Sequence, residues 1–134
     1  MMLLLDTHVL VWLDEGSRRL GKEALGAINE ALANGELGVA AITFWEVAML
    51  VEKQRLIIGA DIEVWRSELL RAGLLEIPLL GTTAIRAGQL PTFHGDPADR
   101  MIVATAMENG ASLMTGDERI LSWAPFSHAV DARL

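Results

Sequence analysis

The sequence predicts a single α/β domain, covering residues 1–134, with a mainly parallel central sheet. Short apolar runs bounded by polar residues alternate with segments whose apolar residues recur at helical spacing. This is the pattern of parallel strands joined by right-handed helical crossovers. The length fits the commonest domain size, roughly 100 to 150 residues. Because 51% of the residues are hydrophobic, the chain has enough apolar material for one core.

The first third of the chain predicts a strand and two helices. Met2–Leu5 is continuous and apolar, which is typical of a strand buried on both faces, and Asp6 ends it. Residues 9–13 predict a short buried helix that a polar turn follows. Ser17 is a candidate N-cap of the next helix. The apolar stripe of that helix consists of Leu20, Ala24, Ile28, Ala31 and Leu32.

The middle of the chain begins with a second buried strand, predicted over residues 37–42. Thr43-Phe44-Trp45-Glu46 follows with the spacing of a capping box, in which the threonine and the glutamate each accept a hydrogen bond from the other's backbone N–H. This spacing puts Glu46 at the third position of a helix. The second carboxylate of the chain therefore also follows a strand.

Further elements alternate in the same way. Asp61 is the expected cap of a helix over 62–70, and residues 74–80 predict a third strand. That strand contains a proline, which cannot donate to a ladder, so it is expected to be short or at an edge. A brief helix over 82–90 precedes the next apolar segment.

The segment His94–Met101 carries the strongest helix start in the chain. Asp96 stands where an N-cap belongs, Pro97 takes the favoured first position, and Asp99 takes the third. An apolar stripe continues from there to Gly110. Considered alone, the two aspartates are explained equally well by capping of the backbone and by a functional site.

The last part predicts a fourth strand over 111–114, a single helical turn over 118–121 and a terminal strand at Val130. Asp117 lies between the fourth strand and the turn. Asp6, Glu46 and Asp117 thus each fall within one helical turn of a strand's end. In open α/β sheets ligands bind beyond the carboxyl ends of the strands. Asp99 joins these acids only if its helix starts at the same edge.

Four carboxylates at one edge need a proton or a cation among them. Two carboxylates about 4 Å apart repel by roughly 4 kcal/mol at an effective dielectric of about 20. A helix cap contributes only about 1 kcal/mol. A shared proton relieves the repulsion in carboxylate dyads, and a divalent cation is the other solution. An all-oxygen set favours Mg²⁺ or Mn²⁺ over zinc, and such an ion can orient a water for attack on phosphorus.

The composition limits the classes of partner and compartment. The formal net charge of -7 opposes nucleic-acid binding at first sight. Metal ions bound among the acids would reduce the negative charge that a substrate encounters at the site. The absence of cysteine excludes disulfides and thiolate metal sites and suits a reducing compartment. No apolar run approaches the roughly 18 residues that span a bilayer, and no secretory signal is present. We therefore expect a cytoplasmic protein without membrane contact.

Four motifs resemble those of a known family. They are Leu3–His8 (LLLDTH), Phe44–Ala48 (FWEVA), Asp96–Ala104 (DPADRMIVA) and Leu113–Asp117 (LMTGD). Each motif is weak alone, but their order and spacing together are fairly specific. The chain resembles the PIN-domain ribonucleases, most closely the VapC-like toxins of bacterial and archaeal toxin–antitoxin pairs.

The resemblance implies a PIN-like three-layer α/β/α sandwich and a metal-dependent endoribonuclease. Asp6, Glu46, Asp99 and Asp117 match the acids that bind Mg²⁺ or Mn²⁺ in the family and support hydrolysis of RNA. Asp117 would act on the metal directly or through a water. The resemblance further implies a homodimer and a small cognate antitoxin that covers or disrupts the site. Asp96 is expected to serve first as the helix cap.

Two other functions remain in competition. An aspartyl-phosphate enzyme or receiver-like switch also places acids at strand ends, but Asp6-Thr7-His8 lacks the second aspartate of a phosphatase motif and no lysine follows a late strand. A catalytically inactive PIN-like module that binds RNA or protein is the alternative within the family. The complete set of acids argues against it.

Several neighbouring residues have open roles. Thr7 and Thr115 are suited to hydrogen bonding with carboxylates or to turn formation. Arg100 is expected to form an ion pair with Asp96 or Asp99 rather than to contact RNA.

Other basic and aromatic residues are candidates for contacts with RNA. No general role is expected of His8 or His94. The candidate phosphate contacts are Arg18, Arg19, Lys22, Lys53 and Arg55. The tryptophans are expected in the core or an interface, although one at the surface would be able to stack on a base. They are Trp12, Trp45, Trp65 and Trp123.

Overall fold

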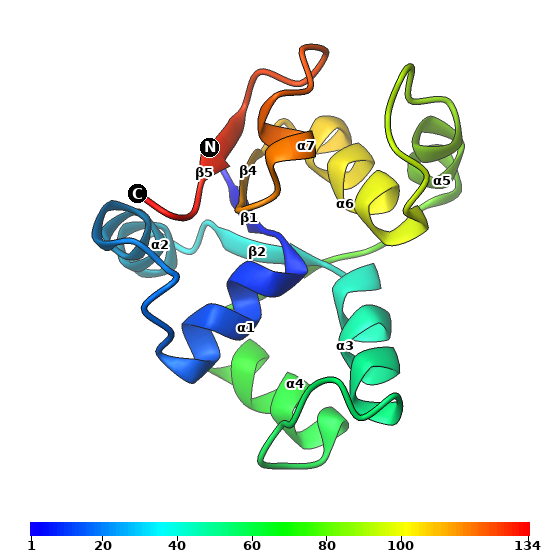
Figure 1. The fold of residues 1–134 in the computed structure, drawn as a ribbon. Helices are drawn as coiled ribbons and strands as arrows, with labels where there is room; N and C mark the ends of the chain where they lie inside the picture. Colours follow the sequence, from blue (N-terminus) through cyan, green and yellow to red (C-terminus); the bar gives the residue numbers. More distant parts are fainter.

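A computed structural model describes residues 1–134 and contains one five-stranded sheet in which all neighbouring strands are parallel (Figure 1). The strand order is β3-β2-β1-β4-β5, so the first strand of the chain lies at the centre. Leu5 of β1 pairs with Val39 on one side and with Met114 on the other. The strands are β1 (Leu3–Leu5), β2 (Leu37–Ala40), β3 (Leu75–Ile77), β4 (Ser112–Thr115) and β5 (Ala129–Asp131).

Helices cover both faces of this sheet, as the predicted three-layer sandwich requires (Figure 1). Side chains alternate along β1, because Leu3 and Leu5 enter one core and Leu4 enters the other. The second core contains side chains of α6 and α7, and α5 packs against α6. The first core is covered by α1 (Thr7–Glu15), α2 (Lys22–Ala33), α3 (Ile42–Glu52) and α4 (Ile62–Arg71). The helices of the other face are α5 (Gly81–Gly88), α6 (Pro97–Glu108) and α7 (Glu118–Leu121).

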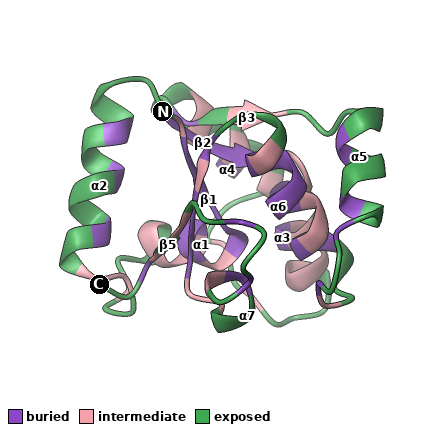
Figure 2. Ribbon diagram, turned by 90° about the horizontal axis from the view of Figure 1, so that it is seen from above, coloured by how far each residue is buried: buried purple, intermediate pink, exposed green.

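Burial follows the layers (Figure 2). The central strands β1 and β2 and the inner side of α6 are buried, whereas the outer sides of α2 and α5 face solvent. Such strands, covered on both faces, account for the continuous apolar runs of the sequence. None of the helices combines the length and the hydropathy that crossing a bilayer demands.

Several local predictions are confirmed. Asp96 caps α6 by accepting a hydrogen bond of 3.1 Å from the backbone N–H of Asp99, with Pro97 at the first position. Asp61 caps α4 in the same manner, through the N–H of Glu63 at 2.9 Å. The third strand is short and lies at the edge of the sheet, and the fifth is parallel to its neighbour.

The predicted N-cap at Ser17 is wrong. The hydroxyl of Ser17 accepts from the N–H of Arg19 in a turn, and α2 begins later with Gly21 as its cap. The first turn of α2 is completed by the other end of the chain, since the N–H of Ala24 donates to the carbonyl of Leu134 at 3.0 Å. A Cβ atom at position 21 would overlap the backbone of Leu134, so only glycine fits.

The predicted capping box at Thr43 is also wrong. Helix α3 begins at Ile42, after Ala41 in a helical conformation, so Thr43 is its second residue and Glu46 its fifth. The Thr43 hydroxyl lies 3.1 Å from the Thr7 hydroxyl and forms a buried hydrogen bond there. Because Glu46 is the fifth residue of α3 and not the third, its side chain does not close the start of its own helix.

Arg100 does not form the expected ion pair with Asp96 or Asp99. Its guanidinium donates to four backbone carbonyls at 2.9–3.2 Å and lies over the Phe93 ring. This Arg100 clamp holds the segment between α5 and α6 against α6, and with it His94. The four carbonyls belong to Ala87, Leu90, Phe93 and His94.

Replacing Arg100 by lysine should lower the free energy of unfolding by about 1–3 kcal/mol, because an ammonium cannot reach all four carbonyls and leaves some unpaired. Urea denaturation monitored by circular dichroism measures this. Arg86→Lys is the matched control, since Arg86 forms a long, half-exposed ion pair with Glu108, in which Nε and Oε2 are 3.8 Å apart. Equal midpoints for the two variants would mean that the clamp contributes nothing to stability.

Candidate metal centre

A cavity of about 180 Å³ lies at the carboxyl ends of the central strands. Asp6 enters it from the end of β1, Glu46 from α3 and Asp99 from the first turn of α6. The helix start at Asp96 therefore does face the edge of the sheet where the other acids lie. Three of the four acids predicted from the sequence share this cavity, and Asp117 is not among its lining residues.

Asp6 is the most firmly held of these acids. Its side chain is the N-cap of α1, accepting from the N–H of Thr7 at 2.8 Å, and its other oxygen accepts from the Thr115 hydroxyl at 2.7 Å. Asp6 is 2% exposed. The Thr115 oxygen also accepts from the N–H of Asp117 at 3.0 Å, so one hydroxyl joins the first acid to the fourth. Both roles predicted for Thr115 are therefore found, since its hydroxyl binds a carboxylate and also closes a turn with the N–H of Asp117.

Glu46 has a buried oxygen, Oε1, that has no hydrogen-bond partner. Burial raises the pKa of this carboxyl group, the Thr7 hydroxyl acts against that rise, and the nearby carboxylates of Asp6 and Asp99 add to it. An ionised oxygen left without a donor in a partly buried cavity is costly. The position therefore suits either a proton or a cation that supplies the missing contact.

Asp99 is buried and is bonded to His94, whose Nε2 lies 2.7 Å from Asp99 Oδ2. Burial raises the pKa of Asp99, while the hydrogen bond from His94 acts against that rise. His94 stacks on Phe93, and the Arg100 clamp fixes its backbone. No role was expected of His94, because only the fold brings its ring to Asp99; its position five residues before an acid was the one available signal.

Asp117 lies beside the cavity and is paired with Arg119. The guanidinium donates to both carboxylate oxygens, at 3.2 Å and 2.9 Å, and the same Nη2 lies 3.6 Å from Asp99 Oδ2. Burial acts to raise the pKa of Asp117, but the hydrogen bonds from Arg119 outweigh it and hold the pKa below its ordinary value. The sequence does not single out Arg119, since an arginine two residues after an acid is common on surfaces.

Two groups of side chains have ligand atoms within 4.8 Å of one another. One group is Glu46, Asp96 and Asp99, and the other is His94, Asp99 and Asp117. Asp99 belongs to both. The donors are mostly carboxylate oxygens, which hard divalent cations prefer, and Glu46 Oε1 lacks any other partner. The residues therefore fit an ion of the Mg²⁺ or Mn²⁺ type.

The wall of the cavity carries a basic and several apolar side chains. Arg55 lines it, as do Trp12 and Leu56. The loop that leads to Asp117 packs tightly here, because a Cβ at Gly116 would lie 2.9 Å from the Trp12 ring and 3.2 Å from His8. The N–H of Gly116 donates to His8 Nε2 at 2.8 Å. His8 thus has a structural role in placing that loop.

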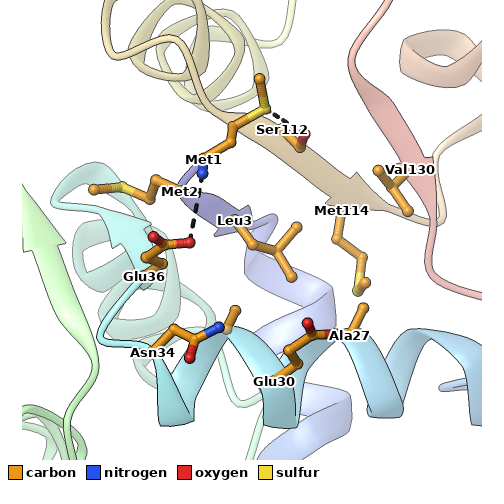
Figure 3. Close-up of a pocket in the computed structure, with 11 residues that line it drawn as sticks. Met1, Met2, Leu3, Ala27, Glu30, Asn34, Glu36, Ser112, Met114 and Val130 are labelled. Carbon is orange, nitrogen blue, oxygen red and sulfur yellow. Dashed lines mark hydrogen bonds and ion pairs between the residues drawn. The ribbon is translucent and has the colours of Figure 1, made fainter.

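A second cavity, of about 260 Å³, lies at the opposite edge of the sheet (Figure 3). Met1, Leu3 and Ser112 contribute to its wall beside α2, and the terminal ammonium group of Met1 lies 3.4 Å from Glu36. The acidic residues that line it are Glu30 and Glu36, and Glu36 is already paired with the terminal ammonium group. Its position at the amino ends of the strands separates it from the acids described above.

The PIN domain family model matches residues 3–124. The chain belongs to the PIN-domain family. Ribonuclease VapC22 of Mycobacterium tuberculosis is 39% identical over 120 residues, which cover 89% of each protein. The resemblance to VapC-like proteins found in the sequence motifs is thereby confirmed.

Solved structures share the fold. VapBC2 from Rickettsia felis, bound to a DNA fragment from the promoter, matches with a TM-score of 0.65 at 16% identity over 98% of both chains. A toxin–antitoxin complex from Klebsiella pneumoniae matches with a TM-score of 0.62 at 19% identity over 97% of both chains. FitAcB from Neisseria gonorrhoeae gives 0.57 at 24% identity over 87% of this chain and 88% of that chain. These likenesses confirm the PIN-like sandwich.

The raised pKa of Glu46 predicts that its own contribution to the stability of the metal-free protein falls as pH rises. A folded state with the higher pKa binds the proton more tightly than the unfolded chain, so this contribution is lost as pH rises from about 4.5 through the raised value. In EDTA at pH 7, the Glu46→Gln protein should therefore have a higher melting temperature than wild type. The difference should disappear as the pH is lowered to about 4.5.

Differential scanning calorimetry across this pH range measures the effect. Glu52→Gln is the control, because Glu52 ends the same helix in an exposed position. A lower melting temperature for Glu46→Gln than for wild type at pH 7 would contradict the account of Glu46.

Proposed function

We propose that this protein is a metal-dependent endoribonuclease, the toxin of a toxin–antitoxin pair. The observation that carries the proposal is the cavity in which Asp6, Glu46 and Asp99 meet with one buried carboxylate oxygen unpartnered. Membership of the PIN-domain family and the likeness to a ribonuclease support it.

The ion that we propose is Mg²⁺ or Mn²⁺, held by Asp6, Glu46 and Asp99, with Asp117 completing the acidic set beside them. When bound, such an ion polarises a phosphodiester and lowers the pKa of a water. The protein contributes fixed ligands: Thr7 and Thr115 hold both oxygens of Asp6, and His94 fixes one oxygen of Asp99. Each of these acids keeps oxygen lone pairs free for a cation.

We assign proton acceptance from the attacking water to Glu46. Its Oε1 has no donor to displace. Asp6 is less suited, because both of its oxygens already accept hydrogen bonds.

Basic and aromatic side chains near the cavity are the proposed RNA contacts. Arg55 lines the cavity, and Arg119 stands at its margin with 61% of its side chain exposed. Trp45 precedes Glu46 on α3 and is 52% exposed, which leaves its ring free to stack on an unpaired base. These contacts would offset the net charge of -7 locally.

The proposed protein partners are a cognate antitoxin and a second copy of the chain. The exposed apolar side chains supply surface for them, since Ile57, Leu80 and Ile85 are 88%, 58% and 62% exposed. The proposed place of action is the cytoplasm, where RNA is available. Light scattering on the purified chain tests the homodimer.

The catalytically inactive binding module is the less favoured function. A protein selected only to bind RNA would gain nothing from carboxylates that repel phosphate at the centre of its cavity. Metal-independent RNA binding without cleavage would support that function.

Asp6→Asn and Asp99→Asn should each lower the rate of RNA cleavage by about 100-fold or more, because each removes a charged ligand from the reacting centre. Gel-based cleavage of a labelled RNA panel in Mg²⁺ and in Mn²⁺ measures the rates. Asp61→Asn is the matched control, since Asp61 is also a helix cap but lies outside the cavity. Wild-type rates in folded Asp6→Asn and Asp99→Asn proteins would refute the proposed function.

Added Mn²⁺ should raise the melting temperature of the wild-type protein, because the ion binds the native state and relieves carboxylate repulsion. The rise should shrink as pH falls and protons compete for Glu46 and Asp99. Thermal shift assays at several Mn²⁺ concentrations measure it. Millimolar Mn²⁺ without any shift at pH 7.5 would count against a preformed site.

A further inference from the structure

Positive charge is distributed unevenly over the acidic edge of the sheet. Asp6, Glu46 and Asp96 form no ion pair with any lysine or arginine. On the other side of Asp99, Asp117 is paired with Arg119, whose guanidinium also lies 3.6 Å from Asp99 Oδ2. Asp99 therefore lies between three carboxylates without a basic partner and one carboxylate that has one.

Arg119 adopts a local geometry that occurs twice in this chain. In both Asp117-x-Arg119 and Asp131-x-Arg133, the arginine N–H and guanidinium donate to the aspartate two residues earlier, at 2.8–3.2 Å. The local pair alone therefore needs no functional explanation. The second carboxylate differs: Arg133 reaches Glu118, which is 72% exposed, whereas Arg119 reaches Asp99, which lines the cavity.

The second contact places the Arg119 charge beside a group of atoms suited to a cation. His94, Asp99 and Asp117 have ligand atoms within 4.8 Å of one another, and Arg119 contacts two of these residues. A divalent ion at this group would have to displace the guanidinium from Asp117. It would also face the repulsion of that fixed positive charge.

We infer that the site takes a single divalent cation at Asp6, Glu46 and Asp99, and that the Arg119 guanidinium takes the place of a second one. The inference rests on the proposed function and specifies its metal count and its phosphate contact. In two-metal sites the ions clamp the reacting phosphate from both sides. Here Arg119 would supply the positive charge that a second ion would otherwise place beside the reacting phosphate.

The guanidinium suits this role in charge and shape. It is planar, always protonated and able to donate to two phosphate oxygens at once. Arg119 is the more solvent-accessible partner of its pair, at 61% against 18% for the Asp117 side chain. It can therefore contact RNA with its remaining donors while Asp117 keeps it oriented.

Counting bound Mn²⁺ by electron paramagnetic resonance tests the inference without relying on activity. The wild-type protein should bind one ion. Arg119→Gln should bind two, because the group at His94, Asp99 and Asp117 becomes available, and Arg119→Lys should still bind one. Adding Asp117→Asn to Arg119→Gln should return the count to one. Arg133→Gln is the matched control and should bind one.

The cleavage rate gives a second readout. Arg119→Gln should cut RNA about 100-fold more slowly than wild type at low Mn²⁺, as expected for loss of one transition-state donor, and recover in part as Mn²⁺ fills the vacated position. Two ions on the wild type, or a single ion on Arg119→Gln, would overturn the inference while leaving the nuclease proposal standing. No ion and no cleavage with the wild type would instead overturn the nuclease proposal.

Discussion

Repulsion between carboxylates that share one small cavity is the constraint on which this structure depends. Asp6, Glu46 and Asp99 contact the same cavity, and burial removes much of the water that would otherwise screen them. Hydrogen bonds from neighbouring elements stabilise two of these carboxylates in the cavity. Asp6 has donors from α1 and β4, and Asp99 has His94. Glu46 alone keeps an oxygen without a donor, which makes it the point where the cavity is least satisfied.

The supporting parts of the structure serve this arrangement at a distance. The Arg100 clamp holds the segment before α6 and thereby His94, which in turn holds Asp99. Gly116 lets the loop after β4 pack on His8 and Trp12, which places Asp117. Rigid placement of ligands by surrounding contacts is a general requirement of metal centres. The packing of this region is therefore part of its chemistry.

Sequence patterns predicted the elements whose causes are local. The apolar runs of β1, β2 and β4 reflect burial on both faces, and the cap at Asp96 depends on residues within one helical turn. Asp6, Glu46 and Asp117 were predicted from their places at strand ends and from the family motifs, whereas Asp99 was predicted from the motifs and from its place at a helix start.

The sequence could not predict contacts made between distant segments. The start of α2 is completed by residues 132 and 134, and Thr43 bonds Thr7 rather than its own helix. Arg100 prefers backbone carbonyls to the acids next to it in sequence, because the fold places four of them around its guanidinium. The same limit hid His94, whose partner is fixed by the turn that precedes α6.

The central place of β1 has a consequence for how the protein is made. Leu3 is synthesised long before Ser112, which is one of its two neighbours in the sheet and lies more than a hundred residues later in the chain. At about 5–20 residues per second, the nascent chain spends several seconds without this pairing. Asp117 and Thr115 arrive later still. The hydrogen bonds that join Asp6 to Thr115 and Thr115 to Asp117 therefore form only after more than a hundred further residues have been synthesised, and until then the acidic centre is incomplete.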